Sequence, residues 1–381
     1  MAPGAPLSSR ALGRATLARQ GLLSPIRATP ADAVERLGSL QAQHPEWPPI
    51  ALAVRAADRR TADLAAALGR REVVRSSLMR ITIHVVTAAD LWPMFTICQR
   101  MRLEQWRLLT KADPATSPLG RRVAAAHPAA LAAMAERPRT SLELDRIMTA
   151  ETGDIDGPVP RLAWRHLTAH VPLIHVPHDG ERYGRSLYVV ATDWLGVPRP
   201  VWELDEARRH LTRRYLAAFG PASVEDLVAY VGRGRGGLSA WRAAIEALGD
   251  SVISVRDADG RTLFDLADGP RPPPHTLAPP RLLARWDSLL LSHAPKWRGR
   301  FLDEEARAAV FTKNADVRPS FLIDGAVAGT WDLVRTSGAA RITLRPIHHL
   351  AASVSDALQA EADRVLTLIT PGDGRRTVDM T

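Results

Sequence analysis

The chain has 381 residues, of which 46% are hydrophobic and 24% charged, a composition typical of a folded globular protein with two to three domains. No run of about 18 apolar residues occurs, so the sequence predicts no membrane span. The basic N-terminus lacks the apolar core of a secretory signal. The net charge of +9 comes almost entirely from arginine, because the chain has only three lysines. The many arginines favour a polyanion as partner. A GC-rich coding sequence, which favours arginine over lysine codons, would explain the same composition equally well.

Cys98 is the single cysteine, so the chain can form neither an intrachain disulfide nor a cysteine-based zinc site. We expect a packed, inert thiol and a reducing, cytoplasmic environment. His166 and His170 are four residues apart, but Pro172 ends the helix that would carry them. We therefore predict no metal and no organic cofactor.

Three helix starts recur along the chain, each with a Thr or Ser followed three residues later by an acidic residue. They begin at Thr29, Thr140 and Ser223. Short helices and then two β-like runs follow the second and third starts, which is the order of a winged helix. The predicted helices are 9–20, 30–40, 160–168, 203–219, 224–231, 238–248 and 352–368, and the predicted strands are 82–86, 173–176, 186–191, 251–256 and 261–266.

Turn signals at Asp179-Gly180, Asp259-Gly260 and Asp324-Gly325 mark three hairpins. The proline-rich segment 268–280 is typical of a linker, and it predicts a boundary between two structural units. We predict a mainly helical α+β protein in which tandem winged-helix units pack into one C-shaped body. The expected units are 1–125, 126–200, 201–270 and a C-terminal α/β region at 281–381.

The segment 37–50, LGSLQAQHPEWPPI, carries two glutamines where an apolar helix face is expected. His44 precedes a proline, which disfavours helical backbone, so the helix should end near residues 40–41. In extended chain Gln41 and Gln43 lie on one side and Ala42 on the other. Two partly buried amides facing one cavity would hold a ligand such as a water molecule, or they would bond to backbone and cap the helix end.

Arginines alternate with aromatic residues in segments 99–107 and 293–300. This pattern suits a groove that binds phosphates and stacks a base or sugar. Arg100 and Arg102 in the first segment fit either a DNA contact or an amphipathic helix. Lys296, Trp297 and Arg298 in the second fit an exposed loop. The segment GRGRGG at 232–237 has the glycine spacing of a dinucleotide-binding motif. That motif follows a strand, whereas a predicted helix precedes this segment, so we interpret it as a turn.

The blocks RLGSLQAQHPEWPPIALAVR and REVVRSSLMRITIHVVTAADL resemble the winged-helix DNA glycosylases of the AlkZ type, and so do RYLAAFGPASVEDLVAYVG, LLARWDSLLLSHAPKWRGR and FLIDGAVAGTWDL. The resemblance extends over about residues 12–368. It implies that Gln41 and Gln43 match the family's Gln-apolar-Gln motif and hold the water that attacks C1′ of a damaged nucleotide.

The resemblance also implies DNA contacts by Arg80, Thr82 and His84, in a block where isoleucine at position 81 replaces the usual glycine. The hairpin at Asp324-Gly325 resembles an element that approaches the DNA groove. His44 departs from the acidic or polar residue expected after the glutamines.

We therefore expect a DNA glycosylase that releases N-alkylated purines, with interstrand crosslinks as a further candidate substrate. The expected partner is double-stranded DNA, with no obligate protein partner. The alternative is a winged-helix transcriptional regulator without catalysis, because winged helices are usually readers of DNA.

Overall fold

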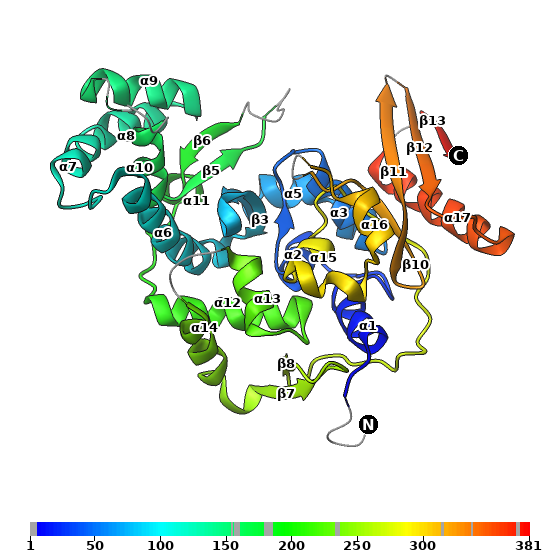
Figure 1. Ribbon diagram of the computed structural model, residues 1–381. Coiled ribbons are helices and arrows are strands. Elements are labelled where there is room, and N and C mark those ends of the chain that lie inside the picture. Colours follow the sequence, from blue (N-terminus) through cyan, green and yellow to red (C-terminus); the bar gives the residue numbers. More distant parts are fainter. Residues whose placement is uncertain are drawn as a thin grey trace.

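The structure is a computed structural model that describes residues 6–153, 155, 161–178, 186–232, 237–313, 316–336, 338–370 and 374–381. Figure 1 shows one broad arc, in keeping with the predicted C-shaped body. Helices α7 (Pro118–Ala124), α8 (His127–Glu136) and α9 (Ser141–Thr152) form one end. The other end is a sheet that packs against α17 (Ala352–Ile369). No helix in the described ranges is long and apolar enough to cross a membrane.

The predicted helix starts are confirmed. Thr29 accepts a hydrogen bond from the Asp32 N–H at 3.1 Å and caps α2 (Pro30–Leu37). Thr140 and Ser223 each form a full capping box, at α9 and at α13 (Val224–Val231). These contacts satisfy N–H groups that a helix leaves unpaired at its first turn.

The largest sheet joins distant parts of the chain in the order β1-β3-β2-β5-β6-β4. Its strands are all antiparallel, and β2 meets β5 where Ser76 pairs with Ile174. This sheet therefore connects the first expected unit to the second. Its strands are β1 (Leu40–Gln41), β2 (Val73–Ser77), β3 (Ile83–Thr87), β4 (Arg139–Thr140), β5 (Leu173–Val176) and β6 (Leu187–Val190).

A second sheet has the order β13-β12-β11-β10-β9 and is antiparallel except for the β12–β13 pair. Its strands are β9 (Arg281–Leu283), β10 (Ser320–Ile323), β11 (Ala326–Thr336), β12 (Ala339–Pro346) and β13 (Arg375–Met380). A separate hairpin pairs β7 (Val252–Arg256) with β8 (Thr262–Leu266).

The order of elements agrees with the winged-helix interpretation in two places. In one, α8, β4, α9, α10, β5 and β6 follow each other, and β4 pairs with the edge strand of the β5–β6 hairpin. In the other, α12, α13 and α14 precede β7 and β8. The predicted turn at Asp179-Gly180 and residues 233–236 of the GRGRGG segment lie outside the described residues.

The remaining helices connect and cover these sheets. They are α1 (Ser9–Arg19), α3 (Trp47–Arg55), α4 (Arg59–Ala62), α5 (Leu64–Gly69), η1 (Met79–Ile81), α6 (Ala88–Thr110), α10 (Leu162–His170), α11 (Ala191–Leu195), α12 (Leu204–Phe219), α14 (Gly237–Glu246), η2 (Gly249–Ser251), α15 (Ser288–Leu291), η3 (Pro295–Arg300) and α16 (Glu304–Val310).

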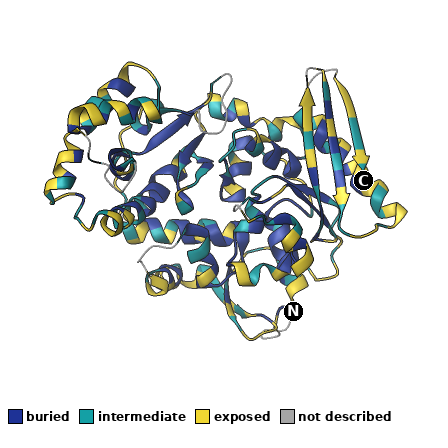
Figure 2. Cartoon of the chain, turned by 45° about the horizontal axis from the view of Figure 1, so that its top comes forward, coloured by how far each residue is buried: buried dark blue, intermediate teal, exposed yellow. Residues whose placement is uncertain are grey.

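Two of the hydrophobic cores cross the expected unit boundaries. One cluster combines residues from 17–85 with residues from 282–366, and a second combines 74–98 with 174–266. Figure 2 shows buried positions concentrated where helices meet the sheets, with exposed outer helix faces. A third cluster, from 123–173, lies almost entirely within the second expected unit and gives that unit a core of its own. The other expected units share their cores, and the boundaries of all four stay a prediction.

Cys98 is buried in the second cluster, and burial raises the pKa of its thiol to about 12. A thiol with so high a pKa stays protonated and unreactive at neutral pH. This agrees with the predicted inert cysteine.

Candidate active site on the first sheet

The two glutamines lie on a short extended segment after α2. Gly38, at φ +79°, ends this helix. Strand β1 then pairs antiparallel with β3, so that Gln41 lies opposite His84. The Ala42 N–H continues the pairing by donating to the Ile83 carbonyl at 2.7 Å. The predicted extended step is confirmed, and the helix ends at Leu37, three to four residues earlier than expected.

Burial alternates along this segment, as the pleat of a strand requires. Leu40 and Ala42 are 2% and 0% exposed, whereas Gln41 and Gln43 are both partly exposed. The two glutamines therefore share one side of the strand. They do not line one cavity, however: Gln43 lines a pocket of about 330 Å³, and Gln41 lines a separate cavity of about 10 Å³.

Both amides are oriented by donors near the β2–β3 turn, one from Arg80 in the turn and one from Ile83 at the start of β3. Arg80 Nη2 donates to Gln41 Oε1 at 3.0 Å, and the Ile83 N–H donates to Gln43 Oε1 at 3.3 Å. Neither donor can accept a hydrogen bond, so each glutamine must present its oxygen. Each oxygen keeps a second lone pair. Among the described residues, neither amide nitrogen has a hydrogen-bond acceptor.

Arg80 is itself held by Tyr230 of α13, which is 150 residues away in the sequence. Its Nη1 donates to the Tyr230 carbonyl, and its guanidinium lies 5.5 Å from the Tyr230 ring centre. The Tyr230 hydroxyl lies 2.8 Å from Ser39 Oγ, next to the glutamine segment. Burial lowers the pKa of Arg80, but a guanidinium remains charged in proteins. Arg80 therefore ties the glutamine strand to α13.

The turn that carries Arg80 has a left-handed backbone. Arg80 and Ile81 have φ values of +55° and +57°. A β-branched residue such as isoleucine strongly disfavours this region, which costs about 1–2 kcal/mol per residue. Ile81 is nevertheless 42% exposed and lines the pocket beside Gln43. The glycine that the family resemblance led us to expect here would adopt this backbone without strain.

His84 is buried, with 1% exposure, which argues against the direct DNA contact expected from the sequence. Its Nδ1 lies 2.9 Å from the Thr82 carbonyl, which can only accept, so Nδ1 carries the proton. Burial, with the nearby Arg80 charge, lowers the pKa of His84 to about 3. The neutral ring thus turns an acceptor nitrogen towards Arg80 Nη2 at 3.4 Å. Its position supports Arg80.

The predicted DNA-binding residues on α6 differ in exposure. Arg102 is 7% exposed and donates to the Thr168 carbonyl and to both oxygens of Ser77. It therefore joins α6 to α10 and to the end of β2. Arg100 is exposed and forms an ion pair with Glu104 at 3.1 Å. Thr82 does not lie on α6 but in the β2–β3 turn, where its hydroxyl donates to the Met79 carbonyl. Of these, Arg100 alone extends its charge into solvent.

The second arginine–aromatic segment forms η3. Lys296 is exposed, and its Nζ lies 4.7 Å from the Trp297 ring centre. The guanidinium of Arg261 lies 3.8 Å from the same ring, and Arg298 donates to the His293 carbonyl. Burial lowers the pKa of Arg298 to about 10. The predicted exposure therefore holds for Lys296 and only in part for the other two.

The turn at Asp324-Gly325 does connect β10 and β11, but it packs against α1. Asp324 forms ion pairs with Arg10 and Arg14. A Cβ on the buried Gly325 would overlap the Arg14 guanidinium. The hairpin that extends away from the body is instead β11–β12 (Figure 1). This placement argues against a DNA contact by Asp324 and Gly325.

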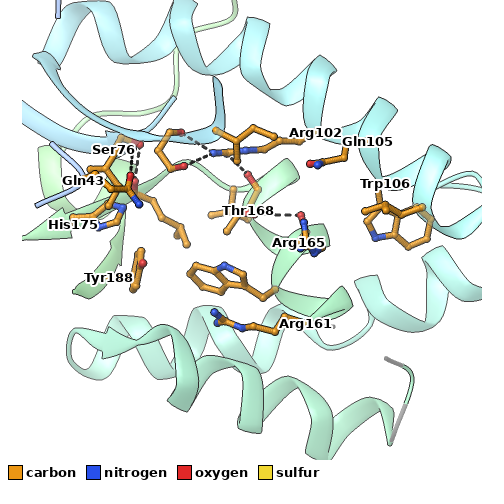
Figure 3. A pocket seen from close by; sticks show the side chains of 17 residues that line it. Gln43, Ser76, Arg102, Gln105, Trp106, Arg161, Arg165, Thr168, His175 and Tyr188 are labelled. Carbon is orange, nitrogen blue, oxygen red and sulfur yellow. Dashed lines mark hydrogen bonds between the residues drawn. The ribbon is translucent and has the colours of Figure 1, made fainter. Parts of the chain in front are cut away.

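The pocket beside Gln43 lies between the first sheet, α6 and α10 (Figure 3). Gln43, Ser76 and His175 gather at one end of it, and Trp106 lies at the other. Sequence reasoning missed His175, Trp164 and Tyr188 as pocket residues, because only the pairing of β2 with β5 brings them to Gln43. Within the described ranges, no group of three or more potential ligands is placed to hold a metal ion.

Comparisons with known proteins agree with this fold. The interstrand DNA cross-link repair glycosylase of Streptomyces sahachiroi is 30% identical over 178 residues, which cover 45% of this chain and 45% of that protein. The match thus spans less than half the length of that relative. The solved structure of Streptomyces sahachiroi DNA glycosylase AlkZ superposes with a TM-score of 0.79 at 21% identity, over 99% of this chain and 100% of that chain.

The structural likeness confirms the predicted α+β fold. The model of the family described as DNA glycosylase AlkZ-like matches residues 34–368, which is most of the chain. The chain belongs to the AlkZ-like family of DNA glycosylases, as the sequence resemblance predicted.

Proposed function

We propose that the protein is a DNA glycosylase that hydrolyses the N-glycosidic bond of N-alkylated purines, including purines that crosslink two strands. The observation that carries this proposal is the pair of oriented amides on β1 and just after it. Gln41 and Gln43 lie on one side of an extended segment, and Arg80 and the Ile83 N–H fix the two amide oxygens. Membership of the AlkZ-like family supports the same reaction class.

The reaction needs little from the protein, because the leaving group is already activated. A purine alkylated at a ring nitrogen is cationic, and the bond to C1′ breaks with its electron pair going to the purine. The base then leaves neutral, and positive charge develops on the sugar. A water oxygen bonds to C1′ and loses a proton to solvent, which leaves an abasic deoxyribose.

The glutamine oxygens supply orientation to this water. Each has a lone pair left after it accepts from Arg80 or from the Ile83 N–H. A water that donates to Gln43 Oε1 in the larger pocket, or to Gln41 Oε1 in its own cavity, keeps a lone pair free for attack. Holding a nucleophile in place contributes to the rate through proximity, and fixed dipoles help to stabilise the developing positive charge. Arg80 acts here as a positioning residue through Gln41.

Binding to DNA would rest on cations that contact phosphates without reading sequence. Arg100 and Lys296 are exposed and suit this role. The net charge of +9 supports it as well. Each phosphate contact releases counterions, so affinity should fall steeply as salt rises.

The test uses duplex DNA with a single N7-methylguanine, incubated with protein and then cleaved with alkali at abasic sites. We expect cleavage by the wild type, and a decrease of at least about 100-fold for Gln41→Ala or Gln43→Ala, since removing one stabilising group of this kind typically costs 10²–10³ in rate. DNA affinity should change little. Gln359→Ala, an exposed glutamine on α17, is the matched control.

The same experiment separates the enzyme from a transcriptional regulator. A regulator would bind one preferred sequence and produce no strand breaks above the blank. Tight binding of the wild type without base release, on any alkylated duplex, would refute the glycosylase proposal.

A further inference from the structure

Ile81 has a strained backbone and an exposed side chain. Its φ of +57° lies in the left-handed region, which a β-branched residue strongly disfavours. Its side chain is 42% exposed and belongs to none of the hydrophobic clusters found in the described part of the chain. Burial of the isoleucine therefore does not offset the strain. Strained residues of this kind cluster at functional sites.

The turn around Ile81 does not need an isoleucine side chain. The Leu78 N–H donates to the Thr82 carbonyl at 2.9 Å, and the Ile81 N–H donates to the Leu78 carbonyl at 2.9 Å. The Thr82 N–H and hydroxyl both donate to the Met79 carbonyl, each at 3.1 Å. Because a glycine at position 81 would keep these bonds with less strain, the side chain has to be explained by a contact outside the fold.

Ile81 lies where two pockets meet. Together with Gln105 of α6, it lines the pocket beside Gln43 and a second pocket of about 900 Å³ between α6, α13 and η3. An exposed apolar patch commonly marks a surface that contacts a partner. Of the nine exposed large hydrophobic side chains in the described ranges, four line one or both of these pockets: Ile81, Leu108, Leu109 and Leu238.

The charge around these apolar side chains indicates the partner. Glu104 and Glu225 line the second pocket, and Glu104 is paired with Arg100. The arginines that line the two pockets outnumber these carboxylates. A basic surface with exposed apolar side chains suits duplex DNA, because cations contact phosphates while apolar residues insert between bases. The arginines are Arg80, Arg102, Arg161, Arg165 and Arg298.

The backbone limits the distance between Ile81 and the glutamines. The Ile83 N–H donates to Gln43 Oε1 at 3.3 Å. Two residues of extended chain span at most about 7 Å, which bounds the separation of Ile81 from Ile83. Successive bases along one DNA strand are about 3.4 Å apart. A side chain inserted by Ile81 would therefore act within about two base steps of a nucleotide whose C1′ lies at Gln43.

We propose that Ile81 is a wedge, a side chain that inserts between neighbouring bases of duplex DNA and unstacks the alkylated nucleotide. The inference rests on the proposed glycosylase function. Unstacking separates the alkylated purine from its neighbour, so that C1′ becomes accessible to the water that a glutamine oxygen orients. A glycine here would leave the bases stacked, and a polar side chain would lose its hydration on entering the apolar space between them.

The test uses the full chain and a duplex that carries one N7-methylguanine with 2-aminopurine as the adjacent base. 2-Aminopurine fluoresces strongly only when it is unstacked. A 2′-fluorine on the alkylated nucleotide stabilises its glycosidic bond, so that the fluorescence is read without cleavage. We expect binding of the wild type to raise the fluorescence beside the lesion, and to leave it unchanged in a second duplex whose 2-aminopurine lies a full helical turn away.

Three substitutions separate the side chain from the backbone. Ile81→Gly removes the side chain and relieves the strain, and Ile81→Asn introduces a polar group of similar size that tolerates positive φ. Both should abolish the fluorescence increase and slow single-turnover release of N7-methylguanine about tenfold, which corresponds to about 1.4 kcal/mol. Ile81→Leu keeps an apolar body and should retain both activities. Val201→Gly, the matched control, removes a β-branched side chain that is 88% exposed and lines neither pocket, and it should change neither measurement.

Urea denaturation distinguishes a wedge from a residue that supports the fold. Ile81→Gly should unfold at the same urea concentration as the wild type or a higher one, although it releases base more slowly. A loss of stability in parallel with the loss of base release would assign Ile81 to the fold and overturn the wedge.

The two readouts separate failure of the wedge from failure of the proposed function. A fluorescence increase that depends on Ile81, without base release by the wild type, supports the wedge and refutes only the glycosylase. An active wild type that matches Ile81→Gly and Ile81→Asn in rate and fluorescence would overturn the wedge. Binding of the wild type with unchanged fluorescence beside the lesion would overturn it as well.

Discussion

Acidification should destabilise the protein through His84, the buried ring behind the glutamine strand. Burial, and next the Arg80 charge, lowers its pKa from 6.5 to about 3. The folded state therefore binds fewer protons than the unfolded state between pH 6.5 and about 3. The stability contributed by the neutral ring is complete above pH 6.5 and is lost as the pH falls towards 3. From pH 6.5 to 5.0 the loss is about 2 kcal/mol, at 1.36 kcal/mol per pH unit.

The assay is urea denaturation at pH 7.5 and 5.0, for the wild type and His84→Gln. Glutamine can accept from Arg80 without titrating, so the variant should lose about 2 kcal/mol less than the wild type on acidification. His349→Gln repeats the substitution at an exposed position and reports the general effect of replacing a histidine. If the wild type and His84→Gln lose the same free energy of unfolding between the two pH values, the assignment of a neutral, buried His84 is wrong.

Three further substitutions test the packing and positioning described above. Asp287→Asn should lower the free energy of unfolding by about 3–5 kcal/mol, because it leaves the buried Arg55, now bonded at 2.6 and 3.0 Å, without its counter-charge. Gly325→Ala should cost about 1–3 kcal/mol, since φ is +81° and the new methyl group would overlap α1. Both are measured by urea denaturation. Arg80→Lys should slow base release about 10- to 100-fold under single-turnover conditions, with DNA affinity changed less than threefold, because a lysine cannot hold Gln41 and α13 together.

The two stability predictions have control substitutions, and the Arg80→Lys prediction has a result that would refute it. Asp205→Asn breaks an ion pair whose carboxylate is 91% exposed, and it should change stability by less than about 0.5 kcal/mol. Gly338→Ala has a similar φ of +79° with no neighbouring atom within 4 Å, so its difference from Gly325→Ala isolates the steric overlap. If Arg80→Lys weakens DNA binding as much as base release, Arg80 contacts DNA rather than positioning Gln41.

Several site residues gave no local signal in the sequence. Tyr230 contacts both Ser39 and Arg80, but 191 and 150 residues separate it from them. His175 is one of four closely spaced histidines and reaches Gln43 only because β5 joins β2. Contacts of this kind depend on how sheets and helices pack, and no short-range spacing rule predicts them.

The residues near Asp324 show a case in which the sequence predicts the local structure but not its position in the fold. Asp-Gly correctly predicts a hairpin turn, because both residues tolerate positive φ. Where that turn lies depends on Arg10 and Arg14 of α1, more than 300 residues away. The pattern identified the local conformation but not the helix against which the turn packs.

The sequence by itself determined the helix starts, the extended step at Gln41 and Gln43, and the family. Capping, proline restrictions and strand alternation act over a few residues, so they can be read directly from the chain. Only the tertiary structure decided which donors orient the two amides, which predicted DNA contacts are buried, and that an aromatic pocket opens beside Gln43. These properties arise where the first sheet joins separate parts of the chain, because a hydrogen bond or a buried charge depends on all of its neighbours in space.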